Sequence, residues 1–265
     1  RCFNGCSSLT GQLSLPSTLK YIGTAVNESW EGLGVFYQCQ FCCELILPEG
    51  LENIGPAAFS NCKSIYGELR IPDTVKSLGY RSFAFMDNIT GSITIPQSIT
   101  YIPTDCFCES GFNGNLTLHD GILAIGEAAF KDNALKGELH LPKEIEIINR
   151  YSFYGCDFSG KLILPKTVKF IGDRAFAWNW RLIGTLEIPE GVLSIGAGAF
   201  AQCRMLEGVI FPTSLESIKY EPSWGEDGGA FQNCFGLGRI VCKGTIPAYV
   251  QDGSFNGVPK DNFTL

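Results

Sequence analysis

The sequence has few of the residues on which most enzymes and metalloproteins depend. Of its 265 residues, only two are histidine and two are methionine. The histidines, His119 and His140, accompany no G-x-S-x-G, H-E-x-x-H or phosphate-loop motif. No cysteine pair has a second pair at zinc spacing. The sequence therefore predicts no catalytic site, no metal site and no cofactor.

The chain also lacks an excess of positive charge and a long apolar run. It has 20 Lys and Arg residues against 27 Asp and Glu, and this net charge of −7 argues against a nucleic-acid partner. No apolar run reaches roughly 18 residues, so we expect no membrane insertion by this segment. The first residues do not resemble a signal peptide. We expect either that a targeting segment was removed or that the chain is part of a longer protein.

One motif recurs from end to end of the sequence. A complete copy runs from Gly184 to Gly208, with the general form G-x-L-x-L/I-P-x-x-L/V-x-x-I-G-x-x-A-F-x-x-C-x-x-L. From Phe36 to Phe200 its Phe recurs every 23 or 24 residues. Such a period indicates a solenoid, in which each unit buries its apolar face against its neighbours. The Phe column comprises Phe3, Phe36, Phe59, Phe83, Phe107, Phe130, Phe153, Phe176, Phe200, Phe231 and Phe255.

Each unit can be interpreted locally. The alternating L-x-L/I pair predicts a short strand, which the following Pro ends. A second apolar pair, such as Val75 and Leu78, fits a turn, a 3₁₀ segment or a bulged strand. The A-F-x-x-C segment has room for one helical turn, and the Phe column is expected to form a buried spine. A recurring Gly after the second pair predicts close stacking of backbones. The expected strands include 13–15, 69–71, 93–95, 139–141 and 186–188.

Half of the 12 cysteines follow the same period, because they lie three residues after a column Phe. Asn133, Asn179 and Met86 occupy this position in other units, so the column of cysteines is interrupted. We expect a small, partly polar, buried position and free thiols in it, although six disulfides would also fit the even count. The cysteines in this position are Cys6, Cys39, Cys62, Cys156, Cys203 and Cys234.

The motif resembles the BspA-like leucine-rich repeats, which also occur in treponemal repeat proteins. The resemblance covers essentially the whole chain, with about nine to ten repeats of 23–24 residues. It implies a right-handed curved solenoid, with short strands in a parallel sheet on the concave side and short helical or 3₁₀ turns on the convex side. We expect one domain over residues 1–265, cut within a repeat at both ends. The resemblance also implies surface display or secretion, commonly in host-associated bacteria, and no shared catalytic residues.

Two insertions mark the first candidate binding site. Ile22 to Phe36 spans 14 residues and Ile218 to Phe231 spans 13, against 5 from Ile54 to Phe59. Insertions at one phase of a solenoid project from one face, often the binding face. Alternatively, each inserted Trp folds back over an apolar edge. The candidate residues are Trp30, Glu31, Trp224, Glu226 and Asp227.

The concave strand surface is the second candidate site. The middle residue of each strand is expected to face solvent, which gives a mixed, weakly acidic surface with aliphatic positions that suits a protein partner. An ordinary solvated sheet face is the alternative. Trp178, Trp180 and Arg181 form a weaker third candidate. The concave candidates are Arg70, Thr94, Thr117, His140 and Glu187.

The sequence thus predicts a non-catalytic extracellular binding or adhesion module of a bacterial cell-surface protein. The expected partner is an extracellular protein of the host or its matrix. A glycan that stacks on Trp30 and Trp224 is an alternative, and a structural spacer is another.

Overall fold

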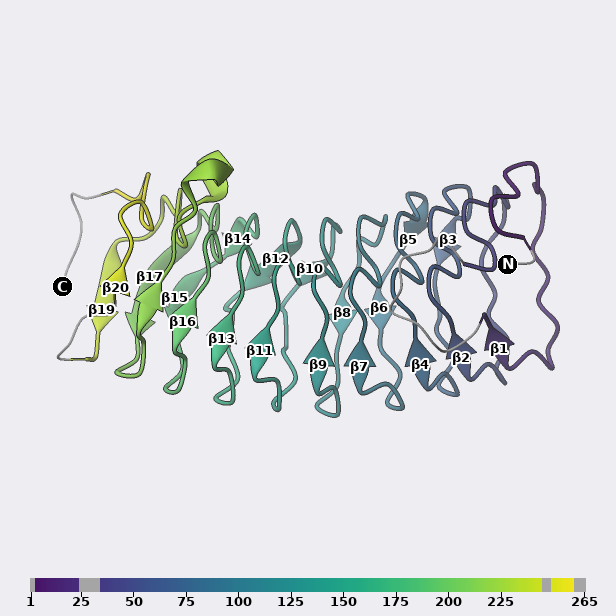
Figure 1. The fold of residues 1–265 in the computed structure, drawn as a ribbon, viewed down its shortest axis with the longest axis horizontal. Helices are drawn as coiled ribbons and strands as arrows, with labels where there is room; N and C mark the ends of the chain where they lie inside the picture. The colour runs from purple at the N-terminus through teal and green to yellow at the C-terminus, as the bar shows by residue number, and fades with distance from the viewer. Residues whose placement is uncertain (1–2, 24–33, 245–248, 260–265) are drawn as a thin grey trace. The chain divides into compact units, whose positions relative to one another are not determined.

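The computed structural model describes residues 3–23, 34–244 and 249–259. The chain divides into two compact units, residues 1–135 and 136–265. Within each unit, successive coils stack so that short strands pair in parallel (Figure 1). This confirms the predicted leucine-rich repeat solenoid. The single domain over residues 1–265 stays a prediction. None of the helices in the described ranges has the length and apolarity to cross a membrane.

The first unit contains nine strands among its described residues. Their ladders run β1-β2-β4, β3-β5, β6-β8 and β7-β9, and the strands in each of these pairs are parallel. The strands are β1 (Tyr21–Ile22), β2 (Asn53–Ile54), β3 (Gly67–Glu68), β4 (Ser77–Leu78), β5 (Ile89–Thr90), β6 (Ile93–Thr94), β7 (Tyr101–Ile102), β8 (Leu116–Thr117) and β9 (Ala124–Ile125).

The second unit has longer ladders. They run β10-β12-β14, β11-β13-β16-β18-β20 and β15-β17-β19. Its elements are β10 (Lys136–Gly137), β11 (Ile147–Ile148), β12 (Asp157–Gly160), β13 (Phe170–Ile171), β14 (Arg181–Leu182), β15 (Gly184–Glu187), β16 (Ser194–Ile195), β17 (Leu206–Phe211), β18 (Ser217–Ile218), the 3₁₀ helix η1 (Pro222–Asp227), β19 (Arg239–Cys242) and β20 (Tyr249–Val250).

The Pro column connects two strand positions in each coil. The Val75 amide donates to the Pro72 carbonyl at 3.0 Å, which closes a four-residue turn that begins at Pro72. A two-residue strand follows at β4 (Ser77–Leu78). The second apolar pair therefore belongs to a turn followed by a strand, which answers the question that the sequence left open.

The expected strand bounds are only partly right. β6 and β15 overlap the expected strands 93–95 and 186–188. Segments 13–15 and 69–71 are not strands in the described structure, and His140 makes a single bridge with Ile163. Side chains still alternate there, with Leu69 and Ile71 buried and Arg70 exposed. The apolar pattern therefore predicts the direction of side chains better than it predicts ladder hydrogen bonds.

The segment around each column Phe is not the expected helical turn. Residues two before and two after the Phe adopt positive φ, as Arg81 (54°) and Phe85 (59°) do around Phe83. The backbone amides of Arg81, Phe83 and Phe85 all donate to carbonyls of the next coil. The Phe83 amide, for example, donates to the Cys106 carbonyl at 2.9 Å. Because the backbone conformation alternates, every second amide points along the stack and donates to the next coil. In a helical turn the amides would donate to carbonyls of the same segment. Only η1 is helical among the described residues.

The Phe column forms the predicted spine within each unit. Phe59, Phe83, Phe107 and Phe130 are fully buried, and their successive ring centroids lie 5.5–5.8 Å apart. In the second unit, the rings from Phe153 to Phe255 stack with centroid distances of 5.2–5.5 Å. Stacked rings at this spacing combine apolar burial with aromatic contact.

The recurring Gly packs as predicted, against the backbone of the preceding coil. A Cβ on Gly172 would lie 2.6 Å from the Arg150 nitrogen, a distance that side chains do not tolerate. Its φ lies outside the left-handed region, so close approach explains this glycine.

In most coils the side chain three residues after the column Phe donates a hydrogen bond to the preceding coil, although Met86 occupies this position after Phe83. Cys62 Sγ donates to the Phe36 carbonyl at 2.9 Å, and Asn179 Nδ2 donates to the Phe153 carbonyl at 2.7 Å. Ser110, which the sequence did not single out, donates to the Phe83 carbonyl at 2.8 Å. Eleven cysteines are described, and none of them forms a disulfide. Burial raises the pKa of Cys62 and of Cys234 to about 12, so both thiols stay protonated at neutral pH.

Candidate functional site

In the first unit, the L-x-L strand face presents the predicted side chains to solvent. Here "strand face" means the exposed middle positions of the L-x-L segments. Arg70, Thr94 and Thr117 are all exposed, and Thr94 is the register partner of Thr117 between β6 and β8. The structure therefore brings the two threonines together. Ile46, at the equivalent position of an earlier coil, is 73% exposed.

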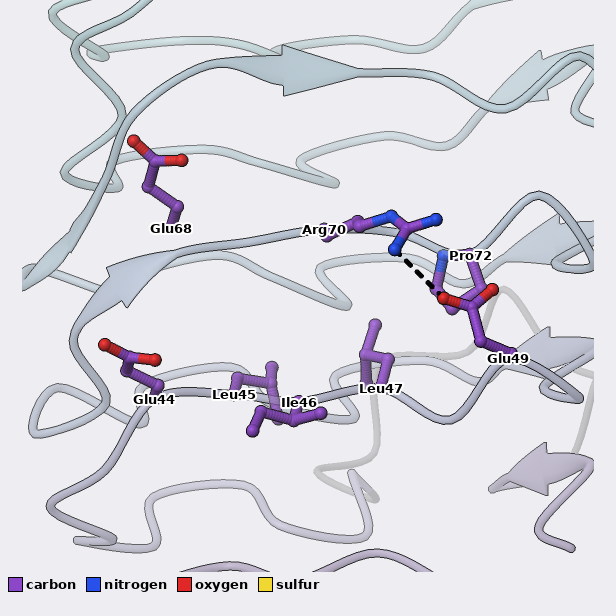
Figure 2. Close-up of a pocket in the computed structure, with 8 residues that line it drawn as sticks. All are labelled: Glu44, Leu45, Ile46, Leu47, Glu49, Glu68, Arg70 and Pro72. Carbon is purple, nitrogen blue, oxygen red and sulfur yellow. Dashed lines mark ion pairs between the residues drawn. The ribbon is translucent and has the colours of Figure 1, made fainter. Parts of the chain in front are cut away.

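Figure 2 shows a shallow open hollow on this strand face, lined from two neighbouring coils. Arg70 Nη1 lies 3.1 Å from Glu49 Oε1, and this ion pair bounds one end of the hollow. Glu44 and Glu68 lie at the other end (Figure 2). The hollow thus combines an aliphatic floor with charge of both signs. Its lining residues are Glu44, Leu45, Ile46, Leu47, Glu49, Glu68, Arg70 and Pro72.

The strand face of the second unit has a similar composition. His140 is exposed, and its Nε2 lies 3.8 Å from Glu138 Oε2. Its bridge partner Ile163 is 73% exposed. Glu187 is exposed at the end of β15 and pairs with Lys243 Nζ at 2.9 Å. An exposed isoleucine again stands among paired charges.

The Trp224 loop, residues 221–228, folds back onto the coils of the second unit. The Glu221 amide donates to the Gly228 carbonyl at 3.0 Å and closes the loop at the base of η1 (Figure 1). The loop then lies over earlier coils, where the Arg174 guanidinium stands 4.2 Å from the Trp224 ring centroid. Trp224 is half-buried. This is the folded-back alternative that the sequence left open. Trp30 and Glu31 lie outside the described residues.

Asp227 anchors this loop. Its carboxylate is buried and accepts hydrogen bonds from Trp178 Nε1 at 2.8 Å and from the Tyr154 hydroxyl at 3.3 Å. Arg174 Nε lies 3.7 Å from the same carboxylate. A buried carboxylate with two donors and a cation nearby is well compensated. Glu226, beside it in the sequence, is exposed, so these two acidic candidates have different environments.

The partners of the loop come from coils that sequence reasoning did not connect with it. Tyr151 accepts a hydrogen bond from Arg174 Nη1 at 2.8 Å, and the Arg150 guanidinium lies 4.8 Å from its ring centroid. Arg150 also lies 5.6 Å from the Trp224 ring. The sequence held a partial signal, because Tyr151 and Arg174 occupy the same repeat position, two residues before a column Phe, and so lie on neighbouring coils. The repeat pattern does not, however, indicate in which direction the insertion folds.

A second aromatic cluster lies at the edge between the Phe turns and the strand face of the second unit. Trp180 is 51% exposed and its Nε1 donates to Asp157 Oδ1 at 2.9 Å. Arg181 Nε lies 3.2 Å from the same oxygen. The Arg204 guanidinium lies 5.9 Å from the Trp178 ring and 5.7 Å from the Phe235 ring. We call the aromatic edge the set Trp178, Trp180, Arg204, Met205 and Phe235.

The described residues offer little for redox or metal chemistry. No group of three or more His, Cys, Asp or Glu side chains within them could hold a metal ion. Cys106 and Cys108 are buried, and burial raises the pKa of each thiol to about 12. Protonated, buried thiols are poor nucleophiles and poor ligands. His119 Nε2 lies 2.9 Å from the Pro96 carbonyl, which gives it a structural role between coils.

Comparison with known proteins identifies the repeat. The family profile described as BspA type Leucine rich repeat region matches residues 32–157 and 124–260, with 6 copies. This repeat count is slightly lower than the nine to ten that the sequence predicts. No curated protein matches the chain at a significant level.

Several solved structures are similar to this chain. A leucine-rich repeat protein from Bacteroides ovatus is 23% identical, with a TM-score of 0.49 over 90% of this chain and 68% of the other. A leucine rich cell surface protein from Faecalibacterium prausnitzii is 19% identical, with a TM-score of 0.41 over 92% of this chain and 75% of the other. The pneumococcal vaccine antigen PcpA is 14% identical, with a TM-score of 0.33 over 97% of this chain and 81% of the other.

Proposed function

The chain belongs to the BspA-type leucine-rich repeat family, and on that basis we propose that it is a non-catalytic binding or adhesion module of a bacterial cell-surface protein. Its partner is an extracellular protein of the host or its matrix, and the strand face is the contact surface. Surface display is what the family resemblance implies.

The observation that carries this proposal is the exposure of isoleucine on the strand face. Ile46 and Ile163 are each 73% exposed. The fold does not require an apolar residue at this outward-facing position, because other coils have a polar residue there. Around them stand the Arg70–Glu49 pair in one unit and the Glu187–Lys243 pair in the other. Apolar positions ringed by polar ones are typical of protein-binding surfaces. Arg70, Thr94, Thr117, His140 and Glu187 are the polar contacts that we assign to this surface.

The glycan alternative depends on open ring faces at Trp30 and Trp224. One face of Trp224 is covered, because the Arg174 guanidinium lies 4.2 Å from the ring centroid. A sugar can stack only on an aromatic face that no other group occupies. This geometry favours a protein partner over a glycan at the Trp224 loop. The spacer alternative predicts that no surface substitution alters binding.

A binding screen of the whole chain distinguishes the three functions. The chain is tested against arrays of extracellular-matrix proteins and of glycans, beside Ile46→Asp, Ile163→Asp and Trp224→Ala variants. We expect a protein hit that weakens in an isoleucine variant and persists in Trp224→Ala. A glycan hit lost in Trp224→Ala would favour the glycan alternative. The absence of any hit would favour the spacer.

A further inference from the structure

The aromatic edge of the second unit is a candidate contact surface separate from the strand face. Met205 is 53% exposed and Phe235 is 51% exposed, which is unusual for large apolar side chains on a single edge. Trp178 is 37% exposed beside them. Trp, Met, Phe and Arg are the residues enriched at protein–protein contacts, and Trp and Arg dominate their binding energy. The composition of the edge therefore points to a protein ligand.

The repeat itself provides an internal comparison. Trp180, Arg204 and Phe235 each lie four residues after a column Phe, in three successive coils. The equivalent residues of the first unit are polar or small, namely Gln40, Lys63, Asp87, Gly111 and Ala134. The fold is built in those coils without an aromatic at this position. The exposed aromatics of the second unit are therefore not a requirement of the solenoid.

Arg204 is held in place at the centre of the edge. Its Nε donates to Gln202 Oε1 at 3.1 Å, and Gln202 is itself almost fully buried. Its guanidinium lies 5.9 Å from the centroid of the Trp178 ring and 5.7 Å from that of the Phe235 ring. The described contacts of Arg204 include no carboxylate. Arg204 is exposed and is held at Nε by Gln202, so its two Nη groups remain available to a carboxylate, whose geometry they match.

Charge distinguishes this edge from the rest of the molecule. The chain carries a net charge of −7. Two carboxylates reach the edge and both are engaged, because Asp157 accepts from Trp180 and lies 3.2 Å from Arg181 Nε, and Asp227 accepts from Trp178. Arg204 is the positive charge of the edge whose described contacts include no carboxylate. A carboxylate of a partner is therefore attracted to this edge through Arg204.

We propose that the aromatic edge binds an acidic, apolar-rich segment of a protein partner. A carboxylate of that segment pairs with the Arg204 guanidinium, and its apolar side chains pack on Trp180, Met205 and Phe235. A glycan is a weaker fit, because the polar groups beside the rings are already engaged: Asp157 accepts from Trp180, and Gln202 accepts from Arg204. This inference deepens the proposed function, on which it rests, by adding a second contact surface and its ligand chemistry.

A phage-displayed library of random linear peptides, panned on the whole chain, tests the inference. We expect enriched peptides that combine Asp or Glu with aliphatic or aromatic residues. Their affinity should fall about tenfold or more in Arg204→Gln and in Trp180→Ala, as is typical of central contact residues. It should also fall as salt is raised, because a charge pair at the surface is screened.

Matched controls separate this surface from general effects. Arg239→Gln removes an exposed arginine of β19, and Ile147→Ala removes an exposed apolar residue of β11 in the same unit. Both should bind the peptides as the unaltered chain does. Arg204→Lys keeps the charge and loses the planar contacts, so it should bind with intermediate affinity. An unchanged melting temperature in each variant shows that the fold is intact.

Several outcomes would overturn the inference. These are no enriched peptide, enriched peptides without acidic residues, equal binding to Arg204→Gln, or a glycan in place of a peptide. The failure of the proposed function is distinguishable from these. If a matrix protein binds the chain and binds all edge variants equally, the inference fails while the proposed function stands. If acidic peptides bind at the edge but no extracellular protein binds the chain, the proposed function fails.

Discussion

The Arg174 guanidinium lies 4.2 Å from the centroid of the Trp224 ring, although 50 positions separate the two residues in the chain. Two full coils and the start of an insertion lie between them. The contact fixes the Trp224 loop on the coils of the second unit, and Asp227 completes it through Trp178 and Tyr154. The loop is thus part of the packed structure of that unit.

Removal of the loop anchor should destabilise the second unit. Asp227→Ala leaves the part-buried donors of Trp178 and Tyr154 without their acceptor, and we expect a loss of about 1–3 kcal/mol in the free energy of unfolding. Glu226→Ala, one residue away and exposed, should change it by less than about 0.5 kcal/mol. Urea denaturation of both variants measures the difference. Equal stabilities would show that Asp227 does not anchor the loop.

Truncation of the Phe spine should be severe in both units. Phe130 and Phe176 are fully buried, and each is stacked on a neighbouring coil. We expect Phe130→Ala and Phe176→Ala each to cost about 3–5 kcal/mol, through lost transfer energy and an unfilled cavity. Thermal unfolding followed by circular dichroism reports the loss. A melting temperature unchanged in both variants contradicts the buried spine.

A methyl group should not fit at the stacking glycine. In Gly172→Ala the new Cβ meets the Arg150 backbone nitrogen at 2.6 Å, so the two coils must separate. Gly50→Ala is the matched control, because its Cβ would lie 3.7 Å from the nearest atom, the Ser17 carbonyl oxygen. We expect a marked fall in melting temperature for Gly172→Ala and little change for Gly50→Ala. Similar behaviour of the two variants would refute close stacking.

Alkaline pH should weaken the chain through its buried thiols. Burial raises the pKa of Cys234 from 9.0 to about 12. Between these values the unfolded thiol ionises while the folded thiol stays protonated, so stability present below pH 9.0 is lost as the pH rises towards 12. The loss is about 1.4 kcal/mol per pH unit for one such group.

Cys234→Ser isolates that contribution. Serine keeps a donor for the Phe200 carbonyl, which Cys234 Sγ contacts at 3.2 Å, and it does not ionise in this range. The unfolding free energy of the variant relative to the unaltered chain should therefore rise between pH 9 and pH 12. If the unfolding free energies of the two proteins changed in parallel with pH, burial would not be what keeps the Cys234 thiol protonated.

The recurring columns predicted much of the fold. Phe59 and Phe176 were assigned to the spine from their spacing alone, and both are buried and stacked. Gly172 was assigned to close stacking for the same reason. Such positions are predictable because every coil repeats the same environment, so the side chain that fits it recurs in the sequence.

Features that depend on backbone conformation were harder to predict. The segment around Phe83 has the composition of a helical turn, but Arg81 and Phe85 adopt positive φ so that their amides reach the next coil. Nothing in the side chains of Arg81 or Phe85 indicates a left-handed conformation. Tertiary hydrogen bonds outweigh local propensity there.

The candidate sites divide in the same way. Arg70 and Thr94 were correctly expected to face solvent, since strand alternation determines this. The surroundings of Trp224 were not foreseen, because its contacts with Arg150 and Arg174 depend on how an irregular insertion folds. Periodicity carries no information about a segment that occurs outside the period.

The measurement that tests the central claim most directly is the affinity of the whole chain for its strongest extracellular protein partner, before and after substitution of the strand face. By surface plasmon resonance, we expect Ile46→Asp or Ile163→Asp to raise Kd about tenfold or more. Tyr21→Asp, at an exposed position away from the L-x-L segments, should leave Kd unchanged. Equal affinities for all four proteins would contradict the strand face as the binding surface.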